Sequence, residues 1–277
     1  YSKTLSAQSG DGSYTWSISS DTLPSGLTLS TQGIISGTPT TSGTSNFTVQ
    51  ATSSGQSATK NLSILVYDSL SISSGAMSKG SIGSAYTDTL EATGGDGTYT
   101  WSQTGGNLPN GLNLSSTGVI SGTPTAAGTS NVTVEVASAG ETRSGSISIE
   151  VLGALNISTD AVLDSSIVGH AYSYTLSATG GDGTYTWSLQ AGSLPSGLGL
   201  STAGVISGIP TTDETKTFTV RVSSFGEVAD KSLSLTIRPK VSITTNALPD
   251  GSVNAAYSHT LSATGGDEFY SWFLASG

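Results

Sequence analysis

Residues 94–101 read GGDGTYTW, and this stretch decides the fold because the chain repeats it. The same stretch is found as SGDGSYTW at residues 9–16, as GGDGTYTW at 180–187 and as GGDEFYSW at 265–272. Its tryptophan recurs at spacings of 85, 86 and 85 residues, as Trp16, Trp101, Trp187 and Trp272. A constant period of this length indicates one supersecondary unit copied in tandem. Each copy is long enough to fold around its own core, so we expect an array of separate domains.

The second copy shows how each copy is built from strands. Tyr86, Leu90 and Ala92 alternate with polar residues, which is typical of a half-buried strand. Short segments broken by Gly and Pro follow at residues 108–124, where proline confines strands to the edges or corners of a sheet. Two clearer strands close each copy, and we expect their apolar residues to point inward: Val132, Val134, Val136, Ile147, Ile149 and Val151 in the second copy, and Phe47, Val49, Ala51, Leu62, Ile64 and Val66 in the first. The third copy places Phe218, Val220, Val222, Leu233, Leu235 and Ile237 at these positions. Every copy gives about seven short strands and no helical periodicity, which predicts an all-β fold of tandem immunoglobulin-like or cadherin-like β-sandwiches.

The Asp-Gly pair inside the repeated stretch predicts a tight turn. Asp96-Gly97 lies between two alternating segments, and Asp-Gly is a strong signal for a type I′ hairpin because both central residues need positive φ. The fourth copy has Glu268 in place of the glycine, so we expect its turn to be looser or of another type.

The repeat boundaries predict four domains that follow one another end to end. These are residues 1–67, a repeat that lacks its first strand, then 68–152 and 153–238, and finally 239–277, which holds only the first strands of a fourth repeat. Because the chain starts inside one repeat and stops inside another, we expect an excerpt of a longer array. The alternative is that separate subunits join head to tail, with the last segment completing the first sandwich of the next chain.

Composition excludes several classes of function. The net charge is −10 and the nine basic residues do not cluster, so a nucleic-acid partner is excluded and binding to anionic membranes is disfavoured. No apolar run approaches the roughly 20 residues needed to span a bilayer, so we expect no membrane insertion in this segment. The absence of cysteine excludes disulfides, thiolate metal sites and cysteine nucleophiles.

Four motifs in constant order connect the chain to a known family. They are Tyr-x-x-Thr-Leu-x-Ala, Gly-Asp-Gly-x-Tyr-x-Trp, Leu-Pro-x-Gly-Leu-x-Leu and Gly-x-Ile-Ser-Gly-x-Pro, the last at residues 33–39, 118–124 and 204–210. The chain resembles the immunoglobulin-like repeats found in tandem in very large bacterial surface and secreted proteins. This resemblance implies a cadherin-like or immunoglobulin-like sandwich and an extracellular or cell-surface location. It implies no enzymatic activity, because the family members serve as stalks, spacers, adhesive modules or accessory domains.

The best candidate for a metal site is the acidic loop of each copy, at Asp11, Asp96, Asp182 and Asp267. Calcium needs six to eight oxygens, usually from several carboxylates, whereas each of these loops offers one aspartate between small residues. We therefore interpret the aspartate as a residue that initiates a turn by bonding to its own backbone, with weak calcium binding as the alternative. No metal, cofactor or catalytic residue is predicted.

Other candidate residues also have a structural interpretation. The tryptophans could form a sugar-stacking platform, but we expect them to lie in the core of each sandwich. His170 and His259 occupy different positions in their copies and the first two copies have no histidine, so a Ser-His-Asp site in every domain is impossible and we predict no enzyme. Five Asn-x-Ser/Thr sites should point outward and could carry glycan, at Asn46, Asn61, Asn113, Asn131 and Asn156. Lys60 and Lys231 align, which suggests an intramolecular cross-link, but Gly145 takes their place in the second copy, so we expect solvated lysines.

Uniform loops decide between the functional hypotheses. The copies differ in length by a single residue, which lies in the opening segment of the third copy, between residues 155 and 172. Ligand-binding sandwiches usually vary their loops. We therefore predict a structural extracellular array, a segment of a bacterial surface stalk, adhesin shaft or surface filament. Its partners would be neighbouring repeats or subunits of the same protein, and a surface glycan. The alternative is a set of carbohydrate-binding accessory modules in a secreted polysaccharide-active protein.

Overall fold

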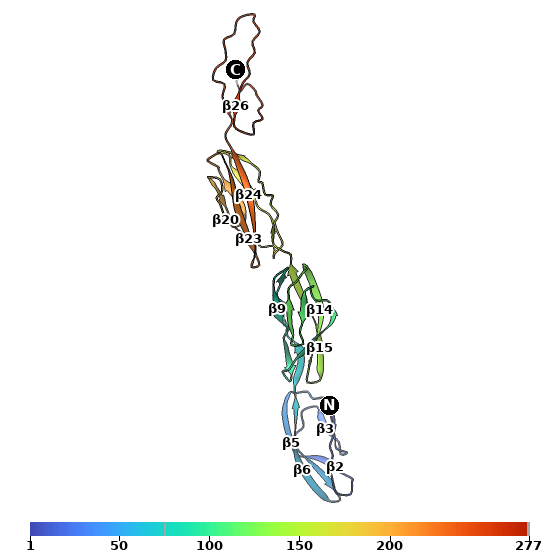
Figure 1. Cartoon of the computed structure of the whole chain (residues 1–277). Helices are drawn as coiled ribbons and strands as arrows, with labels where there is room; N and C mark the ends of the chain where they lie inside the picture. Colours follow the sequence, from blue (N-terminus) through green and yellow to red (C-terminus); the bar gives the residue numbers. More distant parts are fainter. Residues whose placement is uncertain (75, 276–277) are drawn as a thin grey trace. The chain divides into compact units, whose positions relative to one another are not determined.

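The computed structural model describes residues 1–74 and 76–275, in which all regular structure is β (Figure 1). The chain forms two compact units. One consists of Tyr1–Gly80, Ser84–Thr125 and Thr129–Glu150, and the other of Ser81–Gly83, Ala126–Gly128 and Val151–Gly277. No helix in the described residues is long and apolar enough to cross a bilayer.

The first repeat is a sandwich of two three-stranded sheets. Its strands are β1 (Ser2–Thr4), β2 (Thr15–Asp21), β3 (Leu27–Leu29), β4 (Ile34–Gly37), β5 (Gly43–Ser53) and β6 (Gln56–Val66). One sheet has the order β1-β4-β3 and the other the order β2-β5-β6, and all the neighbours are antiparallel. The core between the sheets is built on Trp16, Leu27, Ile35, Phe47 and Val49.

The second repeat has the same two sheets and an additional strand pair. Its strands are β7 (Asp68–Ile72), β8 (Gly80–Ser81), β9 (Tyr86–Thr89), β10 (Ala92–Gly95), β11 (Thr100–Gly106), β12 (Leu112–Leu114), β13 (Val119–Gly122), β14 (Gly128–Ser138) and β15 (Glu141–Leu152). The sheet orders are β12-β13-β9, β11-β14-β15-β8 and β10-β7. The pair β7–β10 brings Leu70 into the core, where its side chain is 2% exposed.

The third repeat copies the second. Its strands are β16 (Asn156–Ile157), β17 (Ser166–Ile167), β18 (Tyr172–Thr175), β19 (Ala178–Thr179), β20 (Thr186–Ala191), β21 (Leu198–Leu200), β22 (Val205–Gly208), β23 (Glu214–Ser224) and β24 (Glu227–Arg238). The short β17 runs parallel to β24, whereas the other paired strands are antiparallel. The fourth copy contributes only the antiparallel pair β25 (Ser242–Ile243) and β26 (Ala263–Thr264). These features confirm the predicted fold class, all-β sandwiches of the immunoglobulin-like kind in tandem.

The predicted inward-facing residues form the cores of the second and third repeats. The six residues expected to point inward in each of these repeats are all buried. In the first repeat Phe47 and Val49 are buried, but Leu62, Ile64 and Val66 on β6 are only half-buried. The reason is that the described part of this repeat has no strand pair corresponding to β7–β10 to cover that side of the core.

A glycine opposite each tryptophan completes the core. Gly118 has φ of +86°, and a Cβ atom at that position would lie 2.7 Å from Cδ1 of Trp101. The same arrangement joins Gly33 to Trp16, where the distance to Cδ1 is also 2.7 Å. Only glycine combines positive φ with this close approach at low cost. The first glycine of the Gly-x-Ile-Ser-Gly-x-Pro motif is therefore required by the tryptophan.

Two details differ from the sequence-based expectations. The second and third repeats have nine strands each rather than about seven, and their closing pair is long, with 11 residues in β14 and 12 in β15. The Asp-Gly pair does not form a type I′ hairpin, because Asp96 lacks positive φ and β10 pairs with β7 instead of β11. The type I′ turn lies at Ala139-Gly140, between β14 and β15, with φ of 51° and 80°.

The same X-Gly turn recurs in the other two repeats. Ser54-Gly55 joins β5 to β6 and Phe225-Gly226 joins β23 to β24, again with positive φ at both residues. Two-residue turns of this type match the right-handed twist of paired strands, which explains why they join the longest strands of each repeat.

Candidate functional site

The acidic loop of the second repeat is held by hydrogen bonds to the protein itself. Asp96 Oδ1 accepts from the Thr98 backbone N at 2.8 Å and from the Ser138 hydroxyl at 2.9 Å. The Ser138 hydroxyl in turn accepts from the Asp96 backbone N at 3.1 Å. The loop between β10 and β11 is thus fastened to the end of β14. These bonds hold the pKa of Asp96 below its usual range, the backbone donor Thr98 having the largest effect and the Ser138 hydroxyl the next.

The first repeat has the same fastening with one further hydroxyl. Asp11 accepts from Ser53 at 2.7 Å, from Ser54 at 2.6 Å and from the backbone N of Ser13 at 3.0 Å. These bonds lower the pKa of Asp11 to about 2. The hydrogen bond from the Ser54 hydroxyl is the largest cause, and that from the Ser53 hydroxyl is the next. In the third repeat Asp182 accepts from Ser224 at 2.8 Å and from the backbone N of Thr184 at 2.9 Å. We call these the Asp–Ser pairs: Asp11–Ser53, Asp96–Ser138 and Asp182–Ser224.

A tyrosine closes the other side of each loop. Tyr99 donates its hydroxyl to the Gly94 carbonyl at 2.9 Å, and Tyr185 donates to the Gly180 carbonyl at 2.9 Å.

In the fourth copy Asp267 still accepts from the Phe269 backbone N at 3.2 Å, and Glu268 takes a φ of 68°. Glu268 thus adopts the left-handed conformation that glycine has in the other copies, and a fourth turn that is looser or of another type stays a prediction.

These contacts are those expected of an aspartate that initiates a turn. In Asp96 the Oδ1 atom accepts from both a backbone and a hydroxyl donor of the same repeat. Among residues 1–74 and 76–275, no group of three or more His, Cys, Asp or Glu side chains could hold a metal ion. The serine partners were missed by the sequence analysis, although Ser53, Ser138 and Ser224 recur at spacings of 85 and 86 residues. That shared period is the signal that could have identified them.

The tryptophans of the three repeats lie in the core, as expected. Trp16, Trp101 and Trp187 are 8%, 4% and 3% exposed. Trp272 differs, because the fourth copy has no closing strands in the described residues to cover it. This ring is 43% exposed, and its centroid lies 6.5 Å from that of Tyr270.

The remaining candidates are surface residues with one exception. His170 and His259 are exposed, and so are the asparagines of all five Asn-x-Ser/Thr sites. Lys60 is exposed as predicted. The prediction of a solvated lysine was wrong for Lys231, whose Nζ donates to the carbonyls of Ile157 at 3.3 Å and Thr159 at 2.6 Å. The ammonium group therefore binds the carbonyl of Ile157, the last residue of β16, and the carbonyl of Thr159 in the loop that follows.

The chain is similar to solved structures of several kinds. A fragment of three immunoglobulin domains of titin is 13% identical, with a TM-score of 0.44, over 81% of this chain and 87% of the fragment. The extracellular domain of protocadherin GammaB4 is 14% identical, with a TM-score of 0.35, over 87% of this chain and 47% of that one. An endo-fucoidan hydrolase of glycoside hydrolase family 107 is 20% identical, with a TM-score of 0.29, and this chain covers 39% of its length. No curated protein sequence matches the chain.

The family comparison is more specific, because it matches each repeat separately. A family model described as "Putative Ig domain" matches residues 1–67, 70–152 and 156–244, which together form most of the chain. The chain therefore belongs to this family of immunoglobulin-like domains, and it carries three of them in tandem.

Proposed function

We propose that the chain is a structural spacer: a segment of a stalk, adhesin shaft or surface filament of an extracellular bacterial protein. The observation that supports this function is the repetition of one internal fastening in every repeat. The Asp–Ser pairs join the aspartate of each acidic loop to a hydroxyl group of its own repeat. A loop that recognised a ligand would keep such groups available and would vary between repeats.

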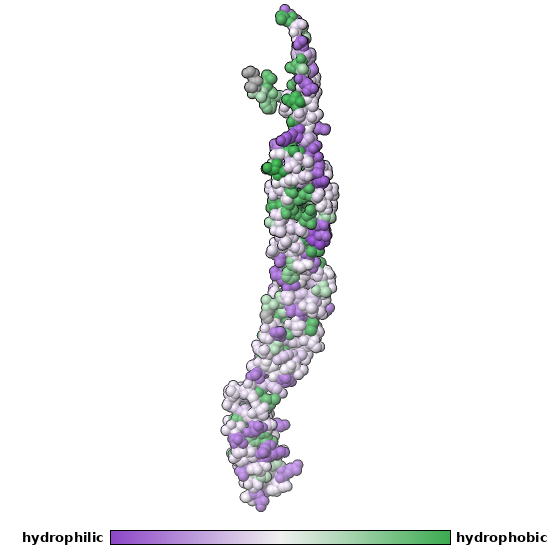
Figure 2. Space-filling view, turned by 90° about the vertical axis from the view of Figure 1, so that its left-hand side faces the viewer, coloured by the Kyte–Doolittle hydropathy of each residue, from purple (hydrophilic) through white to green (hydrophobic). Residues whose placement is uncertain are grey.

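The surface supports the same proposal. Only 10% of the residues are charged, and the visible face in Figure 2 is dominated by residues of intermediate hydropathy. Tandem immunoglobulin-like domains are typically non-enzymatic, and the exposed histidines occupy unrelated positions. A spacer needs repeated, independently stable domains more than it needs a site.

Single-molecule force spectroscopy on the chain tests the proposal. A spacer should unfold one domain at a time, and each event should release up to about 280–310 Å of polypeptide for a repeat of about 85 residues at roughly 3.3–3.6 Å per residue. Antibody labelling of intact cells that make the protein tests its location. Extension without separate force peaks, or labelling only after permeabilisation, would contradict the proposal.

The alternative function is that of carbohydrate-binding accessory modules. That function would need a row of exposed aromatic rings. The three tryptophans of the repeats do not supply it, because they are buried.

A further inference from the structure

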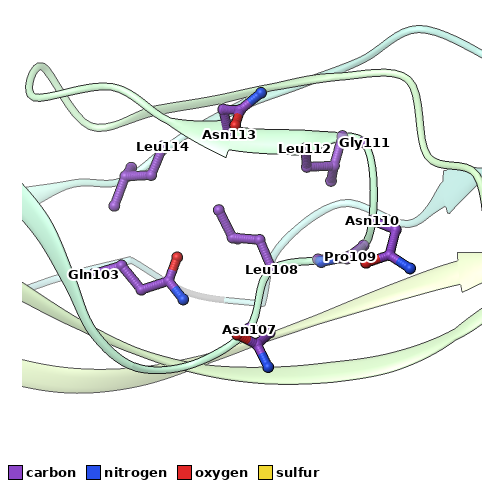
Figure 3. A pocket seen from close by; sticks show the side chains of 9 residues that line it. All are labelled: Gln103, Asn107, Leu108, Pro109, Asn110, Gly111, Leu112, Asn113 and Leu114. Atoms are coloured by element: carbon purple, nitrogen blue, oxygen red, sulfur yellow. The ribbon is translucent and has the colours of Figure 1, made fainter.

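The second repeat contains the one Asn-Gly pair of the sequence, Asn110-Gly111. The pair lies in the loop between β11 and β12, where the backbone N of Leu112 donates to the Pro109 carbonyl at 3.0 Å and closes a tight turn. Figure 3 shows the pair at the point where the chain turns towards β12. An asparagine followed by glycine is the dipeptide whose side chain is most open to attack by the next backbone nitrogen, because glycine has no side chain that obstructs its own nitrogen.

The fold requires the glycine of this pair. Gly111 has φ of +94°, and a Cβ atom there would lie 2.0 Å from the carbonyl oxygen of Thr123. The equivalent glycines of the other two repeats would approach a carbonyl oxygen to 2.1 Å. Only glycine tolerates both the positive φ and this approach. The preceding residue is free to vary, and the sister repeats have Ser25 and Ser196 where the second repeat has Asn110.

The two groups that would react are free of hydrogen bonds. Asn110 is exposed. In the described part of the chain, its carboxamide makes no hydrogen bond and the backbone N of Gly111 donates none. The peptide plane between them is held through the Asn110 carbonyl, which accepts from the backbone N of Thr125 at 2.9 Å and from its hydroxyl at 3.4 Å. Attack on the side chain therefore requires this contact with Thr125 to open.

The reaction needs water and no other co-reactant. The backbone N of Gly111 loses its proton and attacks Cγ of Asn110, so that an N–Cγ bond forms, the Cγ–Nδ2 bond breaks and Nδ2 leaves with a proton as ammonia. The product is a cyclic imide. Water that adds at Cγ breaks the new bond and leaves aspartate in an unchanged backbone. Water that adds at the backbone carbonyl carbon of Asn110 breaks the original peptide bond and leaves isoaspartate, with the backbone running through Cγ.

We propose that Asn110-Gly111 is a self-modification site, at which the chain converts its own asparagine to aspartate and isoaspartate with time. Both products place a negative charge in residues 107–111, none of which is ionisable. Isoaspartate also adds one carbon to the backbone beside Leu112, whose side chain is 6% exposed in the core. The modification should therefore loosen β12. This inference goes beyond the spacer function, since it concerns how one repeat changes with age.

Peptide mapping of the aged whole chain tests the proposal. The chain is kept at neutral pH for several weeks in water labelled with heavy oxygen, digested, and analysed by liquid chromatography and mass spectrometry. We expect loss of Asn110 and the appearance of two products of equal mass, both with solvent oxygen, of which one is a substrate of isoaspartate methyltransferase. The rate should rise with pH, because the deprotonated nitrogen is the form that attacks.

The same loop supplies internal controls. Asn107 and Asn113 are exposed like Asn110, but each is followed by leucine, whose side chain obstructs the attack. Both should remain asparagine over the time in which Asn110 converts.

The sister repeats supply matched variants. Asn110→Ser restores the residue of the other repeats, so it should fold normally and abolish the conversion. Ser196→Asn creates an Asn-Gly pair in the same turn of the third repeat and should introduce a second site of conversion. Hydrogen exchange should show lost protection of β12 amides in the aged chain and unchanged protection in aged Asn110→Ser.

Three results would overturn the proposal. One is an intact Asn110 after the time in which a synthetic peptide of residues 103–114 has converted completely, which would show that the turn prevents the attack. Another is equal conversion of Asn107 and Asn113, which would show that the following glycine is not the reason. The third is a product that contains aspartate without isoaspartate, which would show direct hydrolysis of the side chain instead of a cyclic imide.

Discussion

Replacement of Gly118 by alanine should destabilise the second repeat by about 2–5 kcal/mol, and the estimate has two parts. Gly118 has φ of +86°, and a left-handed conformation costs a residue with a Cβ atom roughly 1–2 kcal/mol. The added methyl group would lie 2.7 Å from Cδ1 and 2.8 Å from Nε1 of Trp101. That indole is 4% exposed, and forcing an extra carbon into a packed core costs typically 1–3 kcal/mol.

Gly97 provides a control that separates the two parts. Its φ is +83°, close to that of Gly118, but a Cβ atom there would meet nothing within 4 Å. Gly97→Ala should therefore show only the conformational cost, about 1–2 kcal/mol. The effect of alanine on the unfolded chain is the same in both variants and cancels in the comparison.

Hydrogen exchange read by mass spectrometry is the suitable assay, because it reports the opening free energy of each repeat in the intact chain. Amides in β13 to β15 should lose protection strongly in Gly118→Ala and weakly in Gly97→Ala. Amides of the third repeat should be unchanged in both variants. Equal losses in the two variants would refute the reasoning, since they would show that the tryptophan contact contributes nothing.

Five further predictions concern the core, the acidic loops and the tyrosines. Trp187→Ala should destabilise the third repeat by about 3–5 kcal/mol, measured by the same exchange experiment, and unchanged protection would contradict a core role. Ser54→Ala should raise the pKa of Asp11 in an NMR titration. Because that pKa is lowered in the folded state to about 2, the stabilisation from this carboxylate is present above the unfolded value of roughly 3.9 and is lost as the pH falls towards 2. Tyr86→Phe should cost about 0.5–1.5 kcal/mol, since the hydroxyl donates to a backbone carbonyl at 3.1 Å. Tyr172→Phe should be neutral or stabilising in thermal melts, because this buried hydroxyl has no hydrogen-bond partner in the described residues. Addition of EDTA should leave the melting temperature unchanged, and a rise of several degrees with millimolar calcium would contradict the turn interpretation of the acidic loops.

Burial also determines the alkaline limit of stability. Desolvation is the main cause that raises the pKa of both Tyr86 and Tyr172 to about 12. Because the raised pKa means that the unfolded chain loses these protons first, the fold keeps its full stability below the unfolded pKa of roughly 10 and becomes less stable as the pH rises from 10 through 12.

The sequence by itself determined the class of fold and most of the core. The period of 85 and 86 residues gave the number of copies, and alternation along strands placed Val134 and Val220 in the interior, where both are 0% exposed. These properties follow from local patterns, because burial of one face of a strand leaves a period of two in the sequence. The recurrence of tryptophan on such a face likewise predicted its place in the core.

The tertiary structure decided which groups meet. Asp96 lies 42 residues from its partner Ser138. The local Asp-Gly signal suggested a hairpin, but the strand before it, β10, pairs with β7 and the strand after it, β11, pairs with β14. Lys231 finds carbonyls more than 70 residues away. Hydrogen-bond partners at such separations depend on strand pairing, and strand pairing is a property of the whole sandwich.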